Sequence, residues 1–513
     1  MNIESVTFGN LGTLIIYLLR ALEEWKAEVW KALKKMKHKK AVGPDNIPID
    51  VWQCLGDEGV SWLTRLFNMI LKTKRMSNEW RKSILVPIYK NKGDVQNYAN
   101  YRGIKLMSHT LKLWERVIEQ RLRHNTKVSE NQFGFMPGRS TIEAIHLLRS
   151  LIEKFKERKE NLHLVFIDLE KAYDKVSREV LWRVLEKKEI CTAYIQVIKD
   201  MYEGAVTSVR TQGGLTKDFP ITVGLHQGSS LSPYLFALIM EVMTGHIQDE
   251  VPWCMLFADD IVLIEKTKEG AKAKLELWRN ALESKGLHLS RSKTEYMECT
   301  FSQERNTYIG DVTIGDQIVK KSERFRYLGS IIQNDGEIDN DVISRIQAGW
   351  VKWRNASGVL CDRKISSKIK GKFYKNIVRQ AMIYGAECWP AKKKHTNKIN
   401  VTEMRMLRWM CGYTRKDRMR NEYIRKKVGV APIEDKLRES RLRWFEHLNR
   451  RPIEAPVRKI ELLDFAHVQR GKGRPKKTWQ ETIRSDLSYL NLDKNLVTDR
   501  AQWKQRIHVA NPT

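Results

Sequence analysis

The stretch Phe257-Ala258-Asp259-Asp260-Ile261-Val262 sets two adjacent carboxylates between two short apolar segments. The flanking pieces, Met255–Phe257 and Ile261–Ile264, are predicted to be short strands. Adjacent like charges repel each other, and a two-residue hairpin turn normally favours glycine. A solvated turn would explain such a pair, but a local rule broken in this way often marks a functional site.

A third carboxylate lies in a similar setting. Asp168 falls near the end of Leu162–Leu169, a run rich in branched apolar residues that is predicted to be a strand. Two divalent cations would relieve the repulsion, because hard oxygen ligands suit Mg²⁺. Two such ions can activate a 3′-hydroxyl and stabilise a leaving pyrophosphate. We therefore predict Asp168, Asp259 and Asp260 to be catalytic and to hold two Mg²⁺ ions, or Mn²⁺ in their place.

Other segments resemble the motifs of reverse transcriptases, and they occur in the same order. Asp168 with an aromatic residue five positions later resembles motif A, and Phe257–Asp260 resembles motif C. The remaining matches are Gly224–Pro233 (motif B), Gly286-Leu287 with Lys293-Thr294 (motif D), Phe325–Gly329 (motif E), and Tyr98–Leu106 and Gln132–Thr141 (fingers motifs). The resemblance runs from about Trp25 to the C-terminus and is most similar to the RTE type of non-LTR (LINE-like) retrotransposon.

The resemblance implies an α+β right-hand polymerase, with fingers, an antiparallel palm sheet, a helical thumb and a basic, mainly helical C-terminal region. It also implies residue roles. Tyr173 would exclude a ribose 2′-hydroxyl, and Lys293 would protonate pyrophosphate, although a buried strand-end tyrosine and a solvated lysine are the alternatives. Further implied roles are triphosphate binding for Arg102 and Lys90, a border of the incoming nucleotide for Gln227 and Gly228, and a primer grip for Tyr327, Leu328 and Gly329.

The pattern of apolar residues predicts individual elements along the chain. Ser232-Pro233 should open a long helix to about His246, with Ser232 as N-cap and Pro233 at the first helical position. Other expected elements are helices near Val60–Lys72, Leu106–Leu122, Ser177–Glu186 and Lys268–Lys285, and strands near Ile84–Ile88, Thr207–Thr211, Thr294–Glu298 and Arg326–Ile332.

The chain length allows several domains. We predict an unassigned segment over 1–20, a helical extension over 21–70, and fingers and palm over 71–335, followed by a thumb-like region over 336–395 and a basic nucleic-acid-binding region over 396–513.

The charge is strongly unbalanced, with 92 Lys+Arg against 61 Asp+Glu. Residues 391–513 alone carry 31 Lys+Arg against 14 Asp+Glu, interleaved with tryptophans. Such a balance favours nucleic acid over a membrane surface as the partner. The resemblance to reverse transcriptases implies an RNA template, a DNA primer and dNTPs. The seven dispersed cysteines favour a reducing compartment, and we expect the nucleus or cytoplasm. No pattern indicates the oligomeric state.

Two further segments carry hypotheses. Arg470–Lys477 resembles an AT-hook, although a nuclear-import signal or a solvated basic loop would fit as well. The first twenty or so residues match nothing in the family, and the family-like region starts close to residue 1. We therefore expect a truncated copy that lacks the upstream endonuclease domain.

Three other functions would each explain part of the sequence. A viral-type RNA-dependent RNA polymerase shares the paired aspartates, but Tyr173 and Gln227 favour deoxynucleotides. A catalytically inactive remnant that only binds nucleic acid would not need the intact motif residues. A purely structural or membrane-bound protein would explain the charge but not the order of the motifs.

Overall fold

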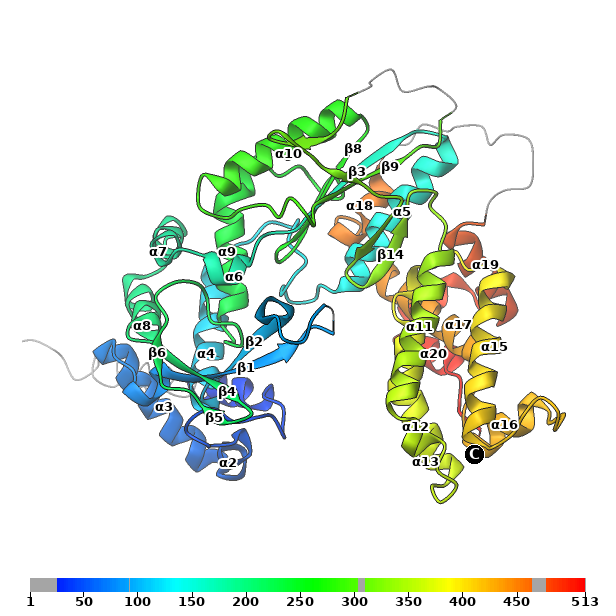
Figure 1. Ribbon diagram of the computed structural model, residues 1–513, viewed down its shortest axis with the longest axis horizontal. Coiled ribbons are helices and arrows are strands. Elements are labelled where there is room, and N and C mark those ends of the chain that lie inside the picture. Colours follow the sequence, from blue (N-terminus) through cyan, green and yellow to red (C-terminus); the bar gives the residue numbers. More distant parts are fainter. Residues whose placement is uncertain (1–24, 92, 303–309, 464–476, 513) are drawn as a thin grey trace, which may run out of the picture. The chain divides into compact units, whose positions relative to one another are not determined.

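The computed structural model describes residues 25–91, 93–302, 310–463 and 477–512 (Figure 1). The described residues form two compact units, each assembled from separate stretches of chain. The first unit contains the described residues up to Ser129, with Leu169–Ile247 and Trp278–Leu289. The second contains Glu130–Asp168, Gln248–Leu277 and the described residues from Ser290 onwards.

The first unit contains a mixed sheet with the strand order β2-β1-β4-β5, and β6 pairs with β4. Strand β1 pairs antiparallel with β2 and parallel with β4. The strands are β1 (Lys82–Tyr89), β2 (Tyr101–Leu106), β4 (Val206–Thr211), β5 (Gly214–Leu215) and β6 (Phe219–Pro220). The α-helices are residues 25–34, α2 (Ile49–Cys54), α3 (Gly56–Thr73), α4 (His109–Asn125), α6 (Ala172–Lys175), α7 (Arg178–Lys187), α8 (Thr192–Tyr202) and α9 (Ser232–Thr244).

One predicted cap in this unit is wrong. Helix α9 begins at Ser232, so Leu231 is the N-cap and Ser232 already lies in the helix. The backbone amides of Leu231 and Ser232 donate to the hydroxyl of Ser229, at 3.0 and 3.1 Å. Ser229, two residues before the N-cap, therefore satisfies two amides at the start of α9, whereas Ser232 as N-cap would have accepted from amides later in the helix.

The second unit contains the sheet that bears the aspartates, with the strand order β12-β9-β3-β8-β7. Its strands are β3 (Leu162–Ile167), β7 (Cys254–Phe257), β8 (Asp260–Glu265), β9 (Glu295–Cys299) and β12 (Lys320–Lys321). All pairs are antiparallel except β12 with β9. Every residue of β3 is buried, which explains why the strand is apolar except for His163, whose ring is hydrogen-bonded to the Tyr296 hydroxyl at 2.6 Å. Apolar side chains of α5 (Thr141–Arg158) share one core with this sheet. The predicted α+β class and the antiparallel palm sheet are confirmed.

The segment predicted as one strand near Arg326–Ile332 is instead a hairpin. Strands β13 (Arg324–Tyr327) and β14 (Ser330–Gln333) pair antiparallel, and Tyr327 lies opposite Ser330. Leu328 and Gly329 form the turn with positive φ angles of 46° and 87°. Glycine adopts such angles without strain, so Gly329 allows the chain to reverse between the two strands.

After β14 the second unit is helical, as predicted. Its α-helices are α11 (Asp339–Asn355), α12 (Ser357–Leu360), α13 (Ser367–Phe373), α14 (Arg379–Ile383), α15 (Lys393–Met410), α16 (Asn421–Val428), α17 (Ile433–Asn449), α18 (Lys459–Leu462), α19 (Trp479–Tyr489) and α20 (Arg500–Ile507). Helix α10 (Lys268–Glu283) contributes residues to both units. The second unit also contains a short hairpin made of strands β10 (Thr313–Ile314) and β11 (Gln317–Ile318).

A buried carboxylate fixes the centre of the helical part. Glu403 of α15 is fully buried and accepts hydrogen bonds from Arg379 at 2.8 Å and from Arg425 at 3.2 Å. It also accepts from the Tyr374 hydroxyl and from the backbone amide of Ile433. Because breaking a buried pair leaves an uncompensated charge, this network links α14, α15, α16 and the start of α17 strongly.

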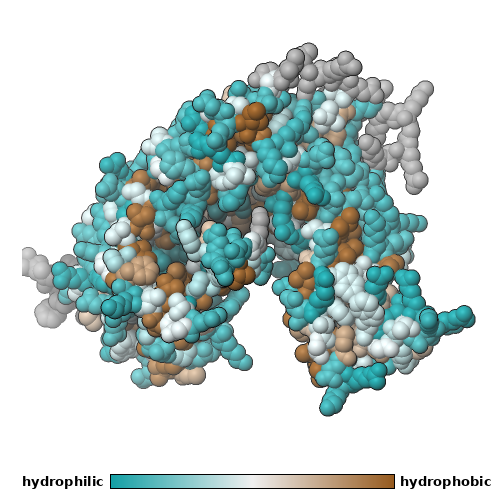
Figure 2. Space-filling model, in the orientation of Figure 1, coloured by the Kyte–Doolittle hydropathy of each residue, from teal (hydrophilic) through white to brown (hydrophobic). Residues whose placement is uncertain are grey.

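The face of the molecule shown in Figure 2 is mainly hydrophilic, with several separate apolar areas. No helix among the described residues is both long enough and apolar enough to cross a bilayer. The first twenty residues and most of the AT-hook-like segment, Arg470–Lys476, lie outside the described residues.

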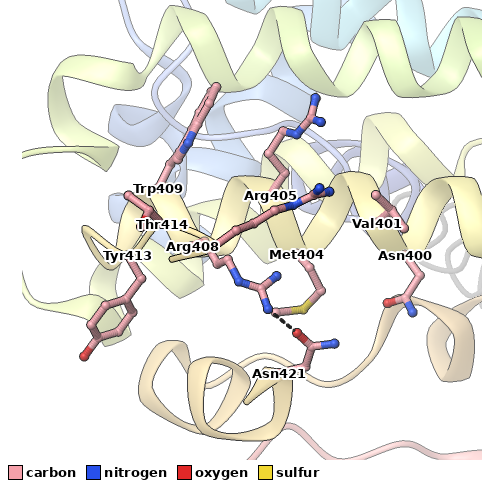
Figure 3. A pocket seen from close by; sticks show the side chains of 10 residues that line it. Asn400, Val401, Met404, Arg405, Arg408, Trp409, Tyr413, Thr414 and Asn421 are labelled. Carbon is pink, nitrogen blue, oxygen red and sulfur yellow. Dashed lines mark hydrogen bonds between the residues drawn. The ribbon is translucent and has the colours of Figure 1, made fainter. Parts of the chain in front are cut away.

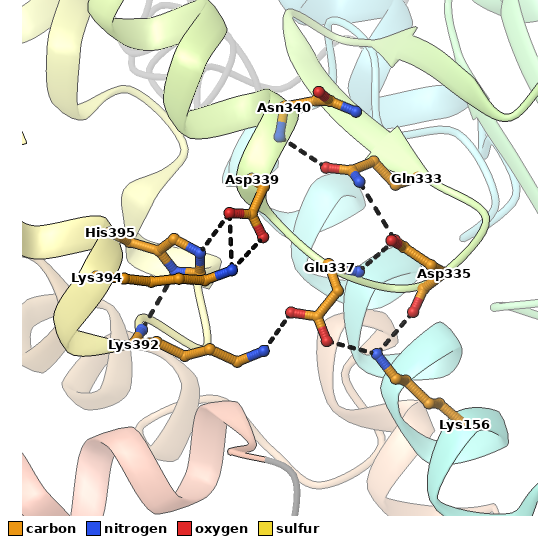
Figure 4. Close-up of polar contacts among 9 residues, drawn as sticks. All are labelled: Lys156, Gln333, Asp335, Glu337, Asp339, Asn340, Lys392, Lys394 and His395. Atoms are coloured by element: carbon orange, nitrogen blue, oxygen red, sulfur yellow. Dashed lines mark hydrogen bonds and ion pairs between the residues drawn. The ribbon is translucent and has the colours of Figure 1, made fainter. Parts of the chain in front are cut away.

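A polar network joins the β14–α11 connection to helices α5 and α15 (Figure 4). Glu337 accepts from Lys156 of α5 at 2.9 Å and from Lys392, which precedes α15. Burial alone would raise the pKa of Glu337, but the hydrogen bonds from Lys392 and Lys156 lower it to about 2. Asp339 forms a neighbouring ion pair with Lys394 at 2.9 Å.

We predict a pH-dependent contribution of Glu337 to stability. Its pKa is lower in the folded chain than the ordinary 4.5, so the stabilisation is present above 4.5 and is lost as the pH falls toward about 2. Urea unfolding at about pH 6 and about pH 3 should show Glu337→Gln losing less stability on acidification than wild type, by about 1 kcal/mol after solvent screening. The exposed Glu454→Gln is the control. Equal losses in all three proteins would contradict the prediction.

Candidate active site

The three aspartates meet at one end of the β3–β8–β7 strands. Ile167 of β3 lies opposite Ile261 of β8, so Asp168, the next residue, lies beside Asp260. Phe257 pairs with Asp260 across the β7–β8 hairpin, which leaves Ala258 and Asp259 as its two-residue turn. The predicted hairpin is confirmed, and its register brings Asp168 to the carboxylate pair.

The turn that carries Asp259 is held by a segment far away in sequence. The side-chain oxygen of Gln132 accepts from the backbone amides of Ala258 at 3.0 Å and Gly134 at 2.9 Å. A Cβ on Gly134 would lie 2.4 Å from the Ala258 nitrogen, closer than real Cβ atoms approach. Ala258 has a positive φ of 58°, a conformation that alanine rarely adopts. The buried Gln132 amide and Gly134 therefore support a strained turn at the site.

The electrostatics of the site depend on burial and on the three neighbouring carboxylates. Desolvation, followed by the neighbouring carboxylates of Asp259 and Asp168, raises the pKa of Asp260 to about 6, against the lowering effect of Lys293. Lys293 donates to Asp168 at 2.8 Å. Lys293 therefore offsets part of the negative charge around Asp260, but the carboxylates of Asp259 and Asp168 act in the opposite direction.

The donor chemistry fits a divalent cation. The candidate ligands are carboxylate oxygens, which Mg²⁺ and Mn²⁺ prefer, and a cation would relieve the repulsion that, after burial, contributes to the raised pKa of Asp260. Within the described residues, however, no group of three or more His, Cys, Asp and Glu side chains is arranged closely enough to hold a metal ion. The ion pair of Lys293 with Asp168 occupies one of the expected ligands.

The predicted primer-grip residues form the β13–β14 turn of the same unit. Tyr327 is buried, and its ring packs 5.9 Å from the ring of Phe166 on β3. Burial raises the pKa of the Tyr327 phenol, with a contribution from Asp260. The carbonyl of Leu328 accepts from the Tyr384 hydroxyl at 2.9 Å, and that of Gly329 accepts from Arg345. Tyr327 therefore anchors the turn in the core and does not present its side chain at the surface.

The first unit brings together another group of predicted residues. The Tyr173 ring stacks on Phe236 of α9 with centroids 4.6 Å apart. Its carbonyl accepts from the amide of Leu225, which fixes the segment that leads into Gln227 and Gly228. The Gln227 side chain donates to Asp174 at 3.3 Å.

The loop that carries Gln227 and Gly228 is clamped against β2. The Lys105 amide donates to the Gln227 carbonyl at 3.0 Å. Gly228 has a φ of 116°, and a Cβ there would lie 2.5 Å from the Lys105 carbonyl oxygen. Only glycine combines that conformation with such a close approach, which explains the residue type at this position.

The loop also rests on a buried acid that the sequence prediction missed. Glu115 of α4 accepts from the Ser229 hydroxyl at 2.6 Å and from the Ser230 amide at 2.7 Å. Burial raises the pKa of Glu115, and the hydrogen bonds from Ser229 and Ser230 oppose that rise. Because the acid lies in an ordinary helical pattern, no local signal in the sequence marks it.

Lys105 is a second residue that the prediction missed. It is buried, and desolvation lowers its pKa to about 8 although Asp174 acts in the opposite direction. Lys90 and Arg102, predicted to bind triphosphate, are both exposed and lie close together across β1 and β2, since Arg102 is opposite Ile88. The Lys90 side chain donates to the Ala99 carbonyl at 3.0 Å.

Comparison with known proteins shows which families this chain is similar to. The family described as "Reverse transcriptase (RNA-dependent DNA polymerase)" matches residues 88–332. The RNA-directed DNA polymerase from the mobile element jockey of Drosophila melanogaster is 25% identical over 442 residues, which is 83% of this chain and 48% of that protein. A Pol polyprotein of the retrotransposable element R2 from Nasonia vitripennis is 24% identical over 58% of this chain and 30% of its own length.

The chain therefore spans about half the length of the first of these relatives. Among solved structures, telomerase from Candida tropicalis in complex with a telomeric RNA fragment covers 82% of this chain and 69% of its own, at 13% identity and a TM-score of 0.39. The family match covers all three strand-end aspartates and both loops described above. Residues 88–332 are therefore a reverse transcriptase domain, and the chain as a whole is similar to RNA-directed DNA polymerases of mobile elements.

Proposed function

We propose that this chain is the RNA-directed DNA polymerase of a non-LTR retrotransposon. It would extend a DNA primer with dNTPs on an RNA template. The observation that carries the proposal is the meeting of Asp168, Asp259 and Asp260 at one edge of a sheet inside a reverse transcriptase domain. The RTE subtype remains a prediction, and nucleus or cytoplasm is the compartment that we infer.

In this proposal Asp168, Asp259 and Asp260 hold two Mg²⁺ ions. When bound, the ions would lower the pKa of the primer 3′-hydroxyl and neutralise charge on the leaving pyrophosphate. The Gln132 amide and Gly134 keep the backbone of the Asp259 turn in place. Lys293, charged and beside Asp168, is positioned to give a proton to pyrophosphate.

The first unit would receive the incoming nucleotide. Arg102 on β2 and Lys90, which directly follows β1, are both exposed, as triphosphate ligands must be. Gln227 and Gly228 lie on a loop fixed by Glu115 and Lys105, which suits a surface against which a base pair is read. The backbone of the Tyr327–Gly329 turn would hold the primer end.

We predict that Asp259→Asn abolishes primer extension. The variant keeps the size of the side chain but removes its charge, so extension on poly(rA) with oligo(dT), dTTP and Mg²⁺ should fall at least about 100-fold. RNA binding, measured by fluorescence anisotropy, should stay at the wild-type level. Asp316→Asn is a matched control, because Asp316 is the exposed second residue of the two-residue turn between β10 and β11. Undiminished extension by Asp259→Asn would refute the catalytic assignment.

We also predict that the Tyr173 ring selects deoxynucleotides. Its stacking on Phe236 holds it rigid, so removing the ring should open space for a 2′-hydroxyl. Tyr173→Ala should lower the preference for dTTP over UTP about tenfold or more, whereas Tyr173→Phe, which keeps the ring, should not. The measurement is the ratio of kcat/KM for the two nucleotides. A wild type that prefers UTP would point to an RNA-synthesising enzyme instead.

A further inference from the structure

A basic pocket lies in the C-terminal helices, far along the chain from the aspartates. It is formed by α15, the start of α16 and the connection between them, and has a volume of about 450 Å³ (Figure 3). Clefts that bind small ligands or single groups of a polymer typically measure about 300–1,000 Å³. None of the ten described residues that line it is acidic. The pocket is therefore large enough for a nucleotide unit and has the right charge.

Three arginines line the pocket: Arg405, Arg408 and Arg415. Arg408 is held in place by Asn421 at 2.6 Å, as Figure 3 shows. Arg405 and Arg415 are exposed, and neither forms an ion pair with a carboxylate among the described residues. The carboxylate of nearby Asp417 already accepts from the amide and the hydroxyl of Thr414. Two guanidinium groups thus remain available for an external anion.

An aromatic ring adjoins these cations. Trp409 is 50% exposed, although its ring also lies 5.5 Å from that of Trp350 and 5.4 Å from that of Trp353. Arg405 and Trp409 are four residues apart on α15, so they share one face of the helix, and they extend to the same side in Figure 3. A tryptophan supported by two neighbours and still half exposed offers a rigid surface for stacking.

We propose that this pocket binds an unpaired stretch of a nucleic-acid strand. Arg405, Arg408 and Arg415 contact consecutive phosphates, and one base stacks on Trp409. The choice of ligand rests on the proposed polymerase function. A base inside a duplex has both faces covered, so a site that depends on stacking takes single strands in preference to duplexes. RNA and DNA strands share the chemistry, and the experiment separates them.

The test measures binding by the full-length chain. Fluorescein-labelled single-stranded RNA, the same sequence as DNA, and the corresponding duplex are titrated by anisotropy over a range of salt concentrations. Arg405→Gln/Arg415→Gln should weaken single-strand binding about tenfold or more. It should also lower the slope of log Kd against log salt by about 1.4, because each phosphate contact on a single strand contributes about 0.7. Trp409→Ala should weaken single-strand binding about fivefold or more and leave duplex binding unchanged.

The matched control removes the same charge elsewhere. Arg484 and Arg506 are exposed on α19 and α20, so Arg484→Gln/Arg506→Gln has the same net charge as the pocket variant. Equal weakening by the two double variants would overturn the proposal, because net charge alone would then explain binding. Competition by polyglutamate as strong as by RNA would overturn it too and favour an acidic protein partner.

A second measurement separates this proposal from that of the polymerase. RNA containing 4-thiouridine is crosslinked to the wild type, and modified peptides are mapped by mass spectrometry. The proposal predicts crosslinks to the segment around Trp409, lost in Arg405→Gln/Arg415→Gln. If these appear while wild type fails to extend a primer, the pocket stands and the polymerase assignment fails. If wild type extends a primer and no crosslink maps to this segment, the pocket assignment is wrong.

Discussion

Repulsion between like carboxylates is the constraint on which the candidate active site depends. The register of β3, β8 and β7 brings Asp168, Asp259 and Asp260 to one edge of a sheet whose central strand is buried throughout. Burial of Asp260, together with the neighbouring carboxylates of Asp259 and Asp168, raises its pKa to about 6. A site that holds negative charge in this way is prepared for cations, which is what phosphoryl chemistry needs.

Both loops that carry candidate residues are held from distant parts of the chain. The Asp259 turn is held by a hydrogen bond to the side-chain amide of Gln132, and the Gln227 loop is held by one to the carboxylate of Glu115. In each case the polar group is buried and accepts hydrogen bonds from backbone amides or a hydroxyl of the loop. Such contacts fix a loop's position without occupying the space in front of it, so each unit presents a rigid surface to a substrate.

The sequence predicted those elements that depend on the local pattern of apolar and polar residues. The β7–turn–β8 hairpin, the buried strand β3 and the helices after β14 follow from apolar spacing, and the aspartates follow from a turn that breaks the usual rules. The wrong cap at Ser232 and the missed reversal at Leu328-Gly329 depend on hydrogen bonding and positive φ that spacing does not encode. Gln132 and Glu115 act across 126 and 114 residues, a separation at which one sequence gives no signal.

Cation binding itself is the most direct test of the account. Mn²⁺ can replace Mg²⁺ at oxygen ligands, and its free ion is measured by electron paramagnetic resonance. Titration of the full chain should show Mn²⁺ binding that weakens at least about tenfold in Asp168→Asn and in Asp259→Asn. Asp316→Asn, with its exposed turn carboxylate removed, should bind as wild type does. Mn²⁺ binding that is the same in all four proteins would contradict the claim that the strand-end aspartates form the cation site.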